Sequence, residues 1–163
     1  MLDPKMEKQL NQQINEELFS SYLYLAMSAY FSAEGLKGFA HWLLAQSQEE
    51  QGHAMKIYDY INDHGGRVLL QAIAEPQASF GSYTEIFKEV LAHEQKITQQ
   101  INDLVDLANK LGDHATHVFL QWFVTEQVEE EGSSQEVLQR VELVGDNGPG
   151  LLALDREMNA RSS

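Results

Sequence analysis

The chain has 163 residues, enough for one domain, and its 25 acidic side chains outnumber 11 basic ones, which gives a formal net charge of −14. Such a surface repels phosphates and attracts cations, so nucleic acid is excluded as a partner. The chain contains no cysteine, which excludes disulfides, thiolate metal sites and cysteine catalysis.

Four long helices are predicted in chain order, at about 5–33, 37–64, 82–111 and 114–144. Residues 65–81 separate the second helix from the third and contain a proline but no helical period. Connections this long without secondary structure are uncommon in compact domains, and a crossover along the bundle would explain this one. An ordinary helical scaffold without a site would show the same helix lengths.

A glycine-rich linker at 145–150 leads to an amphipathic segment, Leu151 to Met158, which predicts a short fifth helix at about 148–159. The predicted fold class is all-α: a four-helix bundle with one long crossover connection plus a short C-terminal fifth helix. We expect a single domain over 1–163, with the bundle at about 5–144. No apolar run approaches the ~20 residues that cross a bilayer, and no secretory signal is visible, so a cytoplasmic protein is expected.

Each long helix carries a carboxylate among its apolar residues. Because successive residues advance ~100° around a helix, Glu50 and Glu94 fall at the centres of the apolar stripes of the second and third helices. Glu17 shares the apolar face of the first helix, while Gln127 is central and Glu130 flanking on the fourth. All lie near mid-helix and so meet in one layer. No lysine or arginine lies on these stripes near that layer, so a metal ion is the natural counter-ion.

His53 lies three residues after Glu50, at the edge of the same stripe, so that both side chains can bind one ion. Oxygen ligands with a single imidazole and open positions favour iron over zinc. A Glu-x-x-His spacing alone is common by chance. Its combination with three further core acids favours a metal site over the scaffold alternative.

Four stretches of the chain match a known pattern: QQINEE at 12–17, GLKGF at 35–39, QEEQGHA at 48–54 and FLQWFVTEQVEEE at 119–131. On these residues the chain resembles a non-haem ferritin of the bacterial and archaeal type, within the ferritin-like di-iron superfamily. The resemblance covers essentially the whole chain. It implies a first iron held by Glu17, Glu50 and His53, and a second held by Glu50, Glu94 and Glu130, with Glu50 as the bridge.

The resemblance also assigns two neighbours of the irons, Gln127 beside the second and Tyr24 near the first. The residues alone favour a core aromatic for Tyr24, so its place near the iron rests on the resemblance. Related proteins with a second Glu-x-x-His have histidine where this chain has Glu130, three residues after Gln127, so the second iron should be held more loosely. Haem-binding relatives carry a methionine where this chain has Gly52, so no haem is expected.

Many proteins of this type bind a third iron nearby. The matching positions here are Glu49, Glu126, Glu129 and Glu130, although a solvated helix face explains the acidic run at 129–131 as well. Gly132 follows directly, and glycine within a helix costs about 1 kcal/mol relative to alanine. We therefore expect the fourth helix to bend or loosen just beyond these residues.

The implied function is iron storage with ferroxidase activity: Fe(II) is oxidised by dioxygen at the two-iron site, and Fe(III) mineral is stored in a homo-oligomeric shell of 24 subunits. One alternative is a di-iron peroxidase or oxygenase without storage, and another is a non-enzymatic metal buffer. The smaller DNA-protecting ferritins build their site between subunits, so a complete set within one bundle argues against that class.

Overall fold

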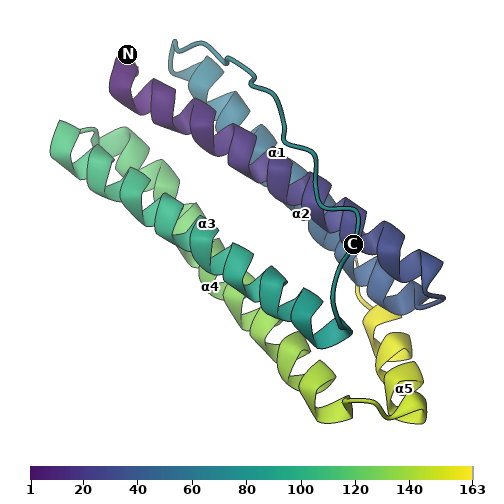
Figure 1. Cartoon of the computed structure of the whole chain (residues 1–163). Coiled ribbons are helices and arrows are strands. Elements are labelled where there is room, and N and C mark those ends of the chain that lie inside the picture. The colour runs from purple at the N-terminus through teal and green to yellow at the C-terminus, as the bar shows by residue number, and fades with distance from the viewer. Residues whose placement is uncertain (163) are drawn as a thin grey trace.

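The computed structural model describes residues 1–162, and within that range it contains five α-helices and no strand (Figure 1). Their bounds are α1 Pro4–Ala33, α2 Lys37–Asp63, α3 Tyr83–Leu111, α4 His114–Val144 and α5 Gly148–Asn159. α1 packs along α2 and α3 along α4, while α5 lies at one end of the bundle (Figure 1). The predicted fold class is confirmed, and the bounds of the four long helices differ from the prediction by at most one residue.

Side chains next to the helices fix where they begin and end. The Asp3 carboxylate accepts the backbone N–H of Lys5 at 2.8 Å and caps α1. Ser82 and Glu85 form a reciprocal capping box at the start of α3. Gly112 ends α3 with a φ of 66°, a conformation that favours glycine. α4 continues as a helix through Gly132, so the loosening expected there is not observed.

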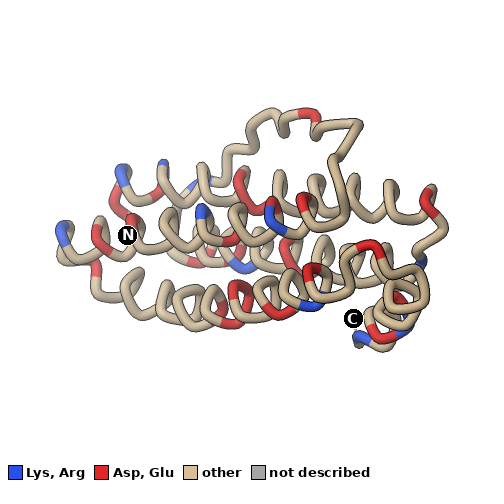
Figure 2. The backbone as a smooth tube through the Cα atoms, turned by 60° about the horizontal axis from the view of Figure 1, so that its bottom comes forward, with Lys and Arg blue, Asp and Glu red and all other residues tan. Residues whose placement is uncertain are grey.

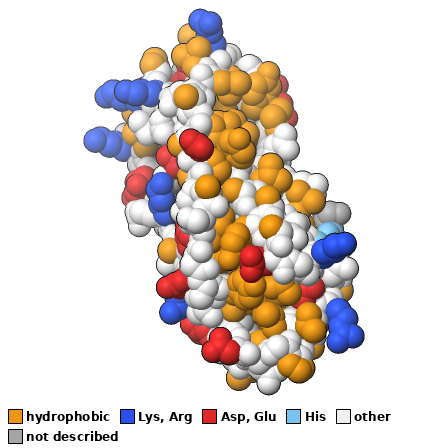
Figure 3. All heavy atoms as spheres, turned by 45° about the vertical axis from the view of Figure 1, so that its right-hand side comes forward, with side chains coloured by type: hydrophobic (Ala, Val, Ile, Leu, Met, Phe, Trp, Pro, Cys, Tyr) orange, Lys and Arg blue, Asp and Glu red, His pale blue; other side chains and the backbone are white. Residues whose placement is uncertain are grey.

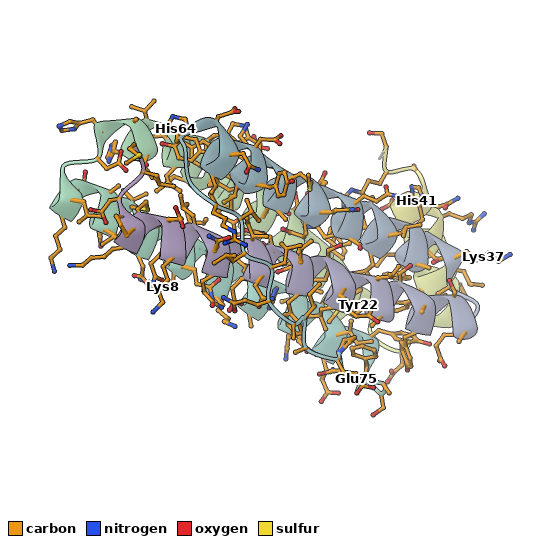
Figure 4. All side chains as sticks on the ribbon, turned by 90° about the horizontal axis from the view of Figure 1, so that it is seen from above. Lys8, Tyr22, Lys37, His41, His64 and Glu75 are labelled. Atoms are coloured by element: carbon orange, nitrogen blue, oxygen red, sulfur yellow. The ribbon has the colours of Figure 1, made fainter. Side chains whose placement is uncertain are left out.

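The crossover that joins α2 to α3 runs over α1, as the view from above shows (Figure 4). Two α1 side chains hold it there by backbone hydrogen bonds. Asn11 donates to the carbonyl oxygen of Arg67 at 2.9 Å and accepts from the N–H of Leu69 at 2.7 Å. Asn15 donates to the carbonyl oxygen of Ala72 at 3.1 Å. The long connection is therefore held against α1 by side-chain hydrogen bonds to its backbone.

α5 docks against the start of α2. The Asp155 carboxylate accepts the backbone N–H of Phe39 at 2.9 Å, which supplies the N-terminal cap that Leu36 lacks. The approach is close, because a Cβ atom on Gly38 would lie 1.6 Å from the carbonyl oxygen of Asp155. The sequence at the start of α2 is thus fitted to receive the fifth helix.

The core consists of two apolar clusters separated by a polar layer. One cluster, toward the α5 end, is built around Phe31, Phe39 and Phe87. The other contains Leu10 and Phe123 among its members. Along every long helix, the residues between the two clusters include buried polar side chains. The apolar clusters hold four helices in register at the level where these polar groups meet.

The surface carries both charge and apolar area. Acidic positions occur along all the helices and outnumber basic ones (Figure 2). Apolar side chains also reach the surface, including Tyr22 and Leu25 on α1 and Leu69 and Leu70 in the crossover. Figure 3 shows a face on which apolar side chains gather over much of the visible surface. None of the described helices combines the length and apolar character needed to cross a membrane.

Candidate metal centre

The polar layer contains the central residues that the sequence predicted, with one carboxylate from each long helix and His53 from α2. Glu17, Glu50 and Glu94 are completely buried, and His53 and Glu130 are each 4% exposed. Local sequence explains the placement, because each carboxylate occupies a position on the apolar stripe of its helix and must turn inward with it. Four buried carboxylates in one layer cannot all stay ionised without a cation, since their mutual repulsion in a low dielectric is large.

Two sets of donor atoms converge within this layer. One oxygen each of Glu17 and Glu50 and one ring nitrogen of His53 lie within 4.8 Å of one another. Oxygens of Glu50, Glu94 and Glu130 form a second group within the same limit. Glu50 belongs to both, so the geometry offers two adjacent ion positions with Glu50 between them. The same residues make up the two ligand sets that the family resemblance implied.

The hydrogen bonds leave coordinating atoms available. Oε2 of Glu17 and Oε1 of Glu50 are buried and accept no hydrogen bond. Nδ1 of His53 lies 3.0 Å from Oε2 of Glu50 and 3.9 Å from Oε2 of Glu17. Buried acceptors without partners are rare because they cost free energy. The unpartnered oxygen of Glu17 and the other oxygen of Glu50 both face Nδ1 of His53. This set of oxygen and nitrogen donors suits iron.

Burial raises the carboxyl pKa values at this centre. For Glu50 the pKa lies well above its usual range because of desolvation, with the Glu94 and Glu17 carboxylates adding to the effect. Desolvation likewise raises the pKa of Glu17. Desolvation and the charge of Glu94 raise the pKa of Glu130 to about 9. Metal-free protein therefore holds protons here near neutral pH, and an entering cation displaces them.

Tyr24 and Gln127 both contact Glu94. The Tyr24 hydroxyl donates to Oε1 of Glu94 at 2.5 Å, which places it against a ligand of the second ion position, whereas the resemblance associated it with the first. The Gln127 amide donates to Oε2 of Glu94 at 3.2 Å, with the Glu94 carbonyl and Thr98 as further acceptors. Burial raises the pKa of Tyr24 well above its usual range, so it remains a hydrogen-bond donor.

The four residues predicted for a third ion are not equally placed. Glu126 and Glu130 form a third converging group, together with His53. Nε2 of His53 lies 3.7 Å from Oε1 of Glu126. Glu129 is exposed and belongs to none of the converging groups found among residues 1–162. Glu49 lies 3.1 Å from Nη2 of Arg161, a partner that the sequence did not suggest.

Two buried glutamines were missed by the sequence analysis. Gln13 is 3% exposed and donates to Oε1 of Glu17 at 3.0 Å. Gln46 is completely buried and donates to Oε2 of Glu130. Each stands one helical turn before a predicted ligand, Gln13 before Glu17 and Gln46 before Glu50. A polar residue four positions before an inward-facing acid, on the same stripe, was the signal that could have found them.

Comparisons with known proteins agree with this picture. A profile described as the ferritin-like domain matches residues 7–144. A bacterial non-heme ferritin of Staphylococcus saprophyticus is 41% identical over 162 residues, which cover 99% of this chain and 97% of that protein. The bacterial non-heme ferritin of Staphylococcus aureus is 38% identical, over 99% of this chain and 98% of its own. An open-pore ferritin from the archaeon Archaeoglobus fulgidus superimposes with a TM-score of 0.98 at 44% identity, covering 99% of this chain and all of that one.

Proposed function

Because this chain belongs to the ferritin family and so is an iron storage protein, we propose that it is a ferroxidase that oxidises Fe(II) with dioxygen at the two-ion centre of its bundle. The observation that carries the proposal is the shared position of Glu50, which has an unpartnered oxygen and takes part in both converging donor sets. Two ions bridged by one carboxylate can together deliver two electrons to a single dioxygen.

The residues of the centre act on the substrate iron in distinct ways. Glu17 and His53 hold the first ferrous ion, Glu94 and Glu130 hold the second, and Glu50 keeps the two adjacent. The protons displaced from Glu50 and Glu130 on binding leave anionic ligands, which favour the ferric state. After oxidation the ferric product moves away from the centre to a mineral store.

We propose further that storage takes place inside a shell of 24 identical subunits located in the cytoplasm. The exposed apolar side chains of α1 and the crossover support self-association, because exposed apolar patches mark interaction surfaces. The third ion, held by Glu126 and Glu130 with Glu49 and Glu129 nearby, would lie on the route from the centre to the store.

The cavity geometry favours ferroxidase activity over an oxygenase acting on an organic substrate. A cavity of about 530 Å³ lies between α1 and α3, and its wall includes Gln13 and Glu16 but none of the central carboxylates. An oxygenase needs its organic substrate beside the metal ions. Ferrous ions and dioxygen are small enough to need no such pocket.

The test is aerobic addition of Fe(II) to the assembled protein, with oxygen consumption and ferric absorbance followed together. Wild-type protein should oxidise iron rapidly and keep the product soluble. A Glu17→Ala, Glu50→Ala double variant should oxidise it no faster than buffer. Glu75→Gln, which removes an exposed carboxylate in the crossover, is the control and should match wild type (Figure 4). Equal rates in wild type and the double variant would contradict the proposal.

A further inference from the structure

Three buried glutamine amides each donate a hydrogen bond to a different carboxylate of the metal centre. Gln13 of α1 donates to Oε1 of Glu17 at 3.0 Å, and Gln46 of α2 donates to Oε2 of Glu130. The third amide is that of Gln127, which donates to Glu94 as described above. Gln13 and Gln46 bind within the centre, yet neither belongs to the predicted metal-ligand sets.

The carboxylate in the middle of the site, Glu50, differs from these three in its hydrogen bonds. Glu50 receives no amide hydrogen bond; its side chain contacts the ring of His53, and its Oε1 has no partner. Glu17, Glu94 and Glu130 each belong to only one of the two donor sets that share Glu50, and each has one oxygen that accepts an amide N–H. The hydrogen bonds therefore distinguish the terminal ligands from the bridging one.

Burying these amides has a cost that packing does not explain. Gln46 lies between α2 and α4 with no exposed surface, and its Oε1 is buried without a partner. A buried amide acceptor without a hydrogen bond destabilises the folded state, because it has lost its hydrogen bond to water. An apolar side chain of the same length would fill the position without that cost. The N–H that reaches Glu130 is the feature that an apolar residue could not supply.

We propose that Gln13 and Gln46 are positioning residues of the two-ion centre, Gln13 for the first ion through Glu17 and Gln46 for the second through Glu130; this inference rests on the proposed function. An oxygen that accepts an amide proton is held in place and is a weaker metal ligand, so Glu17 and Glu130 each bind their ion through the other oxygen. Oε2 of Glu17, the atom left without a partner, is the one that faces His53. Glu50 alone stays free to contact both ions.

The two roles should separate in binding experiments, because, of the two donor sets that share Glu50, Glu17 belongs only to the first and Glu130 only to the second. Glu130 also belongs to the outer group with His53 and Glu126. Hydrogen-bond partners of metal ligands typically contribute 10- to 100-fold in metal affinity. Loss of the Gln13 amide should lower the affinity for the first ion by about that factor and leave the affinity for the second unchanged. Loss of the Gln46 amide should do the reverse.

The experiment measures binding of Co²⁺ to the assembled protein without oxygen, by calorimetry and by the visible absorption of the bound ion. Gln13→Met and Gln46→Met keep the approximate length and volume of the side chain and remove the amide that donates the hydrogen bond. Glu17→Gln and Glu130→Gln identify which binding step and which absorption band belong to which ion. Gln46→Met in a Glu130→Gln background should have no further effect on the second step, because its partner is already altered.

Opposite selectivity of the two methionine variants would support the proposal. Equal weakening of both steps by either variant, or no weakening by both, would overturn it, since a general packing defect or an irrelevant amide would give those results. If wild-type protein fails to bind two Co²⁺ ions per subunit at this centre, the proposed function fails and this inference with it. A normal wild-type result with non-selective variants would overturn the positioning role alone.

Discussion

The hydroxyl of Tyr24 on α1 donates a 2.5 Å hydrogen bond to Oε1 of Glu94 on α3, across the interior of the bundle. Both side chains are completely buried. With the Gln127 amide on Oε2, both oxygens of Glu94 accept hydrogen bonds before any ion arrives. Tyr24 thus fixes the orientation of a ligand that belongs to the second ion position only.

Tyr24→Phe should therefore lower the affinity for the second ion by about 10-fold and leave the affinity for the first unchanged. Hydrogen-bond partners of metal ligands contribute to metal affinity on that scale. Anaerobic Co²⁺ calorimetry measures both steps. Tyr22→Phe is the matched control, since Tyr22 is 48% exposed on the outer face of the same helix (Figure 4). A weaker first ion in Tyr24→Phe would instead associate this tyrosine with the first position.

Glu126 and Glu129 were predicted as equivalent ligands of a third ion, but only Glu126 approaches His53, at 3.7 Å from Nε2. Carboxylates that face the free ring nitrogen of a metal-binding histidine orient the ring and strengthen its bond to the metal. Glu126→Gln should therefore lower the affinity for both the third ion and the first. Glu129→Gln should affect the third ion alone. Identical binding isotherms for the two variants would show that the His53 contact has no consequence.

The positively charged side chain of Arg161 pairs with Glu49, one of the residues predicted for the third ion. Its guanidinium lies 3.1 Å from Oε1 of Glu49, donates to the Trp42 carbonyl and covers the Trp42 ring. A metal ion that uses Glu49 must compete with this charge. Arg161→Met should raise the affinity for the third ion by up to about fivefold, since a partly exposed ion pair contributes about 1 kcal/mol or less.

Arg140→Met is the control for that experiment, because Arg140 pairs with Glu136 and Glu157 and contacts none of the predicted ligands. The readout is the number and affinity of bound Zn²⁺ ions per subunit by equilibrium dialysis. Lower third-ion affinity in Arg161→Met would indicate that Arg161 supports the outer site instead of competing for it.

The raised pKa of Glu130 makes the metal-free protein less stable at high pH. Its carboxyl pKa is 4.5 in the absence of structural effects and about 9 in the folded chain, so the folded state binds the proton more tightly than the unfolded state. This contribution to the free energy of unfolding is complete below pH 4.5 and is lost progressively as the pH rises toward about 9.

Glu130→Gln stays uncharged at every pH and should show a shallower fall in the free energy of unfolding across that range. Guanidinium unfolding of metal-free protein at a series of pH values, followed by circular dichroism, gives both slopes. A saturating amount of Zn²⁺ should reverse the trend in wild type, because the metal replaces the proton. Parallel slopes for the two metal-free proteins would contradict the protonated state of Glu130.

The sequence predicted the central ligands because each of them interrupts an apolar stripe. Glu50 and Glu94 could be found on this basis alone, and His53 followed from its spacing. Gln13 and Gln46 interrupt the same stripes, but an amide carries no charge that demands a counter-ion, so its burial drew no attention. A neutral polar residue one helical turn from an inward-facing acid therefore indicates a hydrogen-bond partner of that acid.

Contacts between helices were beyond the reach of the sequence. Stripes show which face of a helix is buried but not which partner it meets, so the bond from Tyr24 to Glu94 was not predicted. The pairing of Arg161 with Glu49 depends on how α5 docks, and that is set by Gly38 and Asp155 in three dimensions. The fold itself was predictable because helix lengths and one long connection leave few arrangements.

The central claim is that two iron ions bind within the bundle and share Glu50. The most direct measurement is anomalous diffraction at the iron edge from crystals of the assembled protein soaked in Fe(II) without oxygen. We expect two peaks per subunit, one among Glu17, Glu50 and His53 and the other among Glu50, Glu94 and Glu130. A fully occupied soak with iron only at surface carboxylates, and none between these residues, would contradict it.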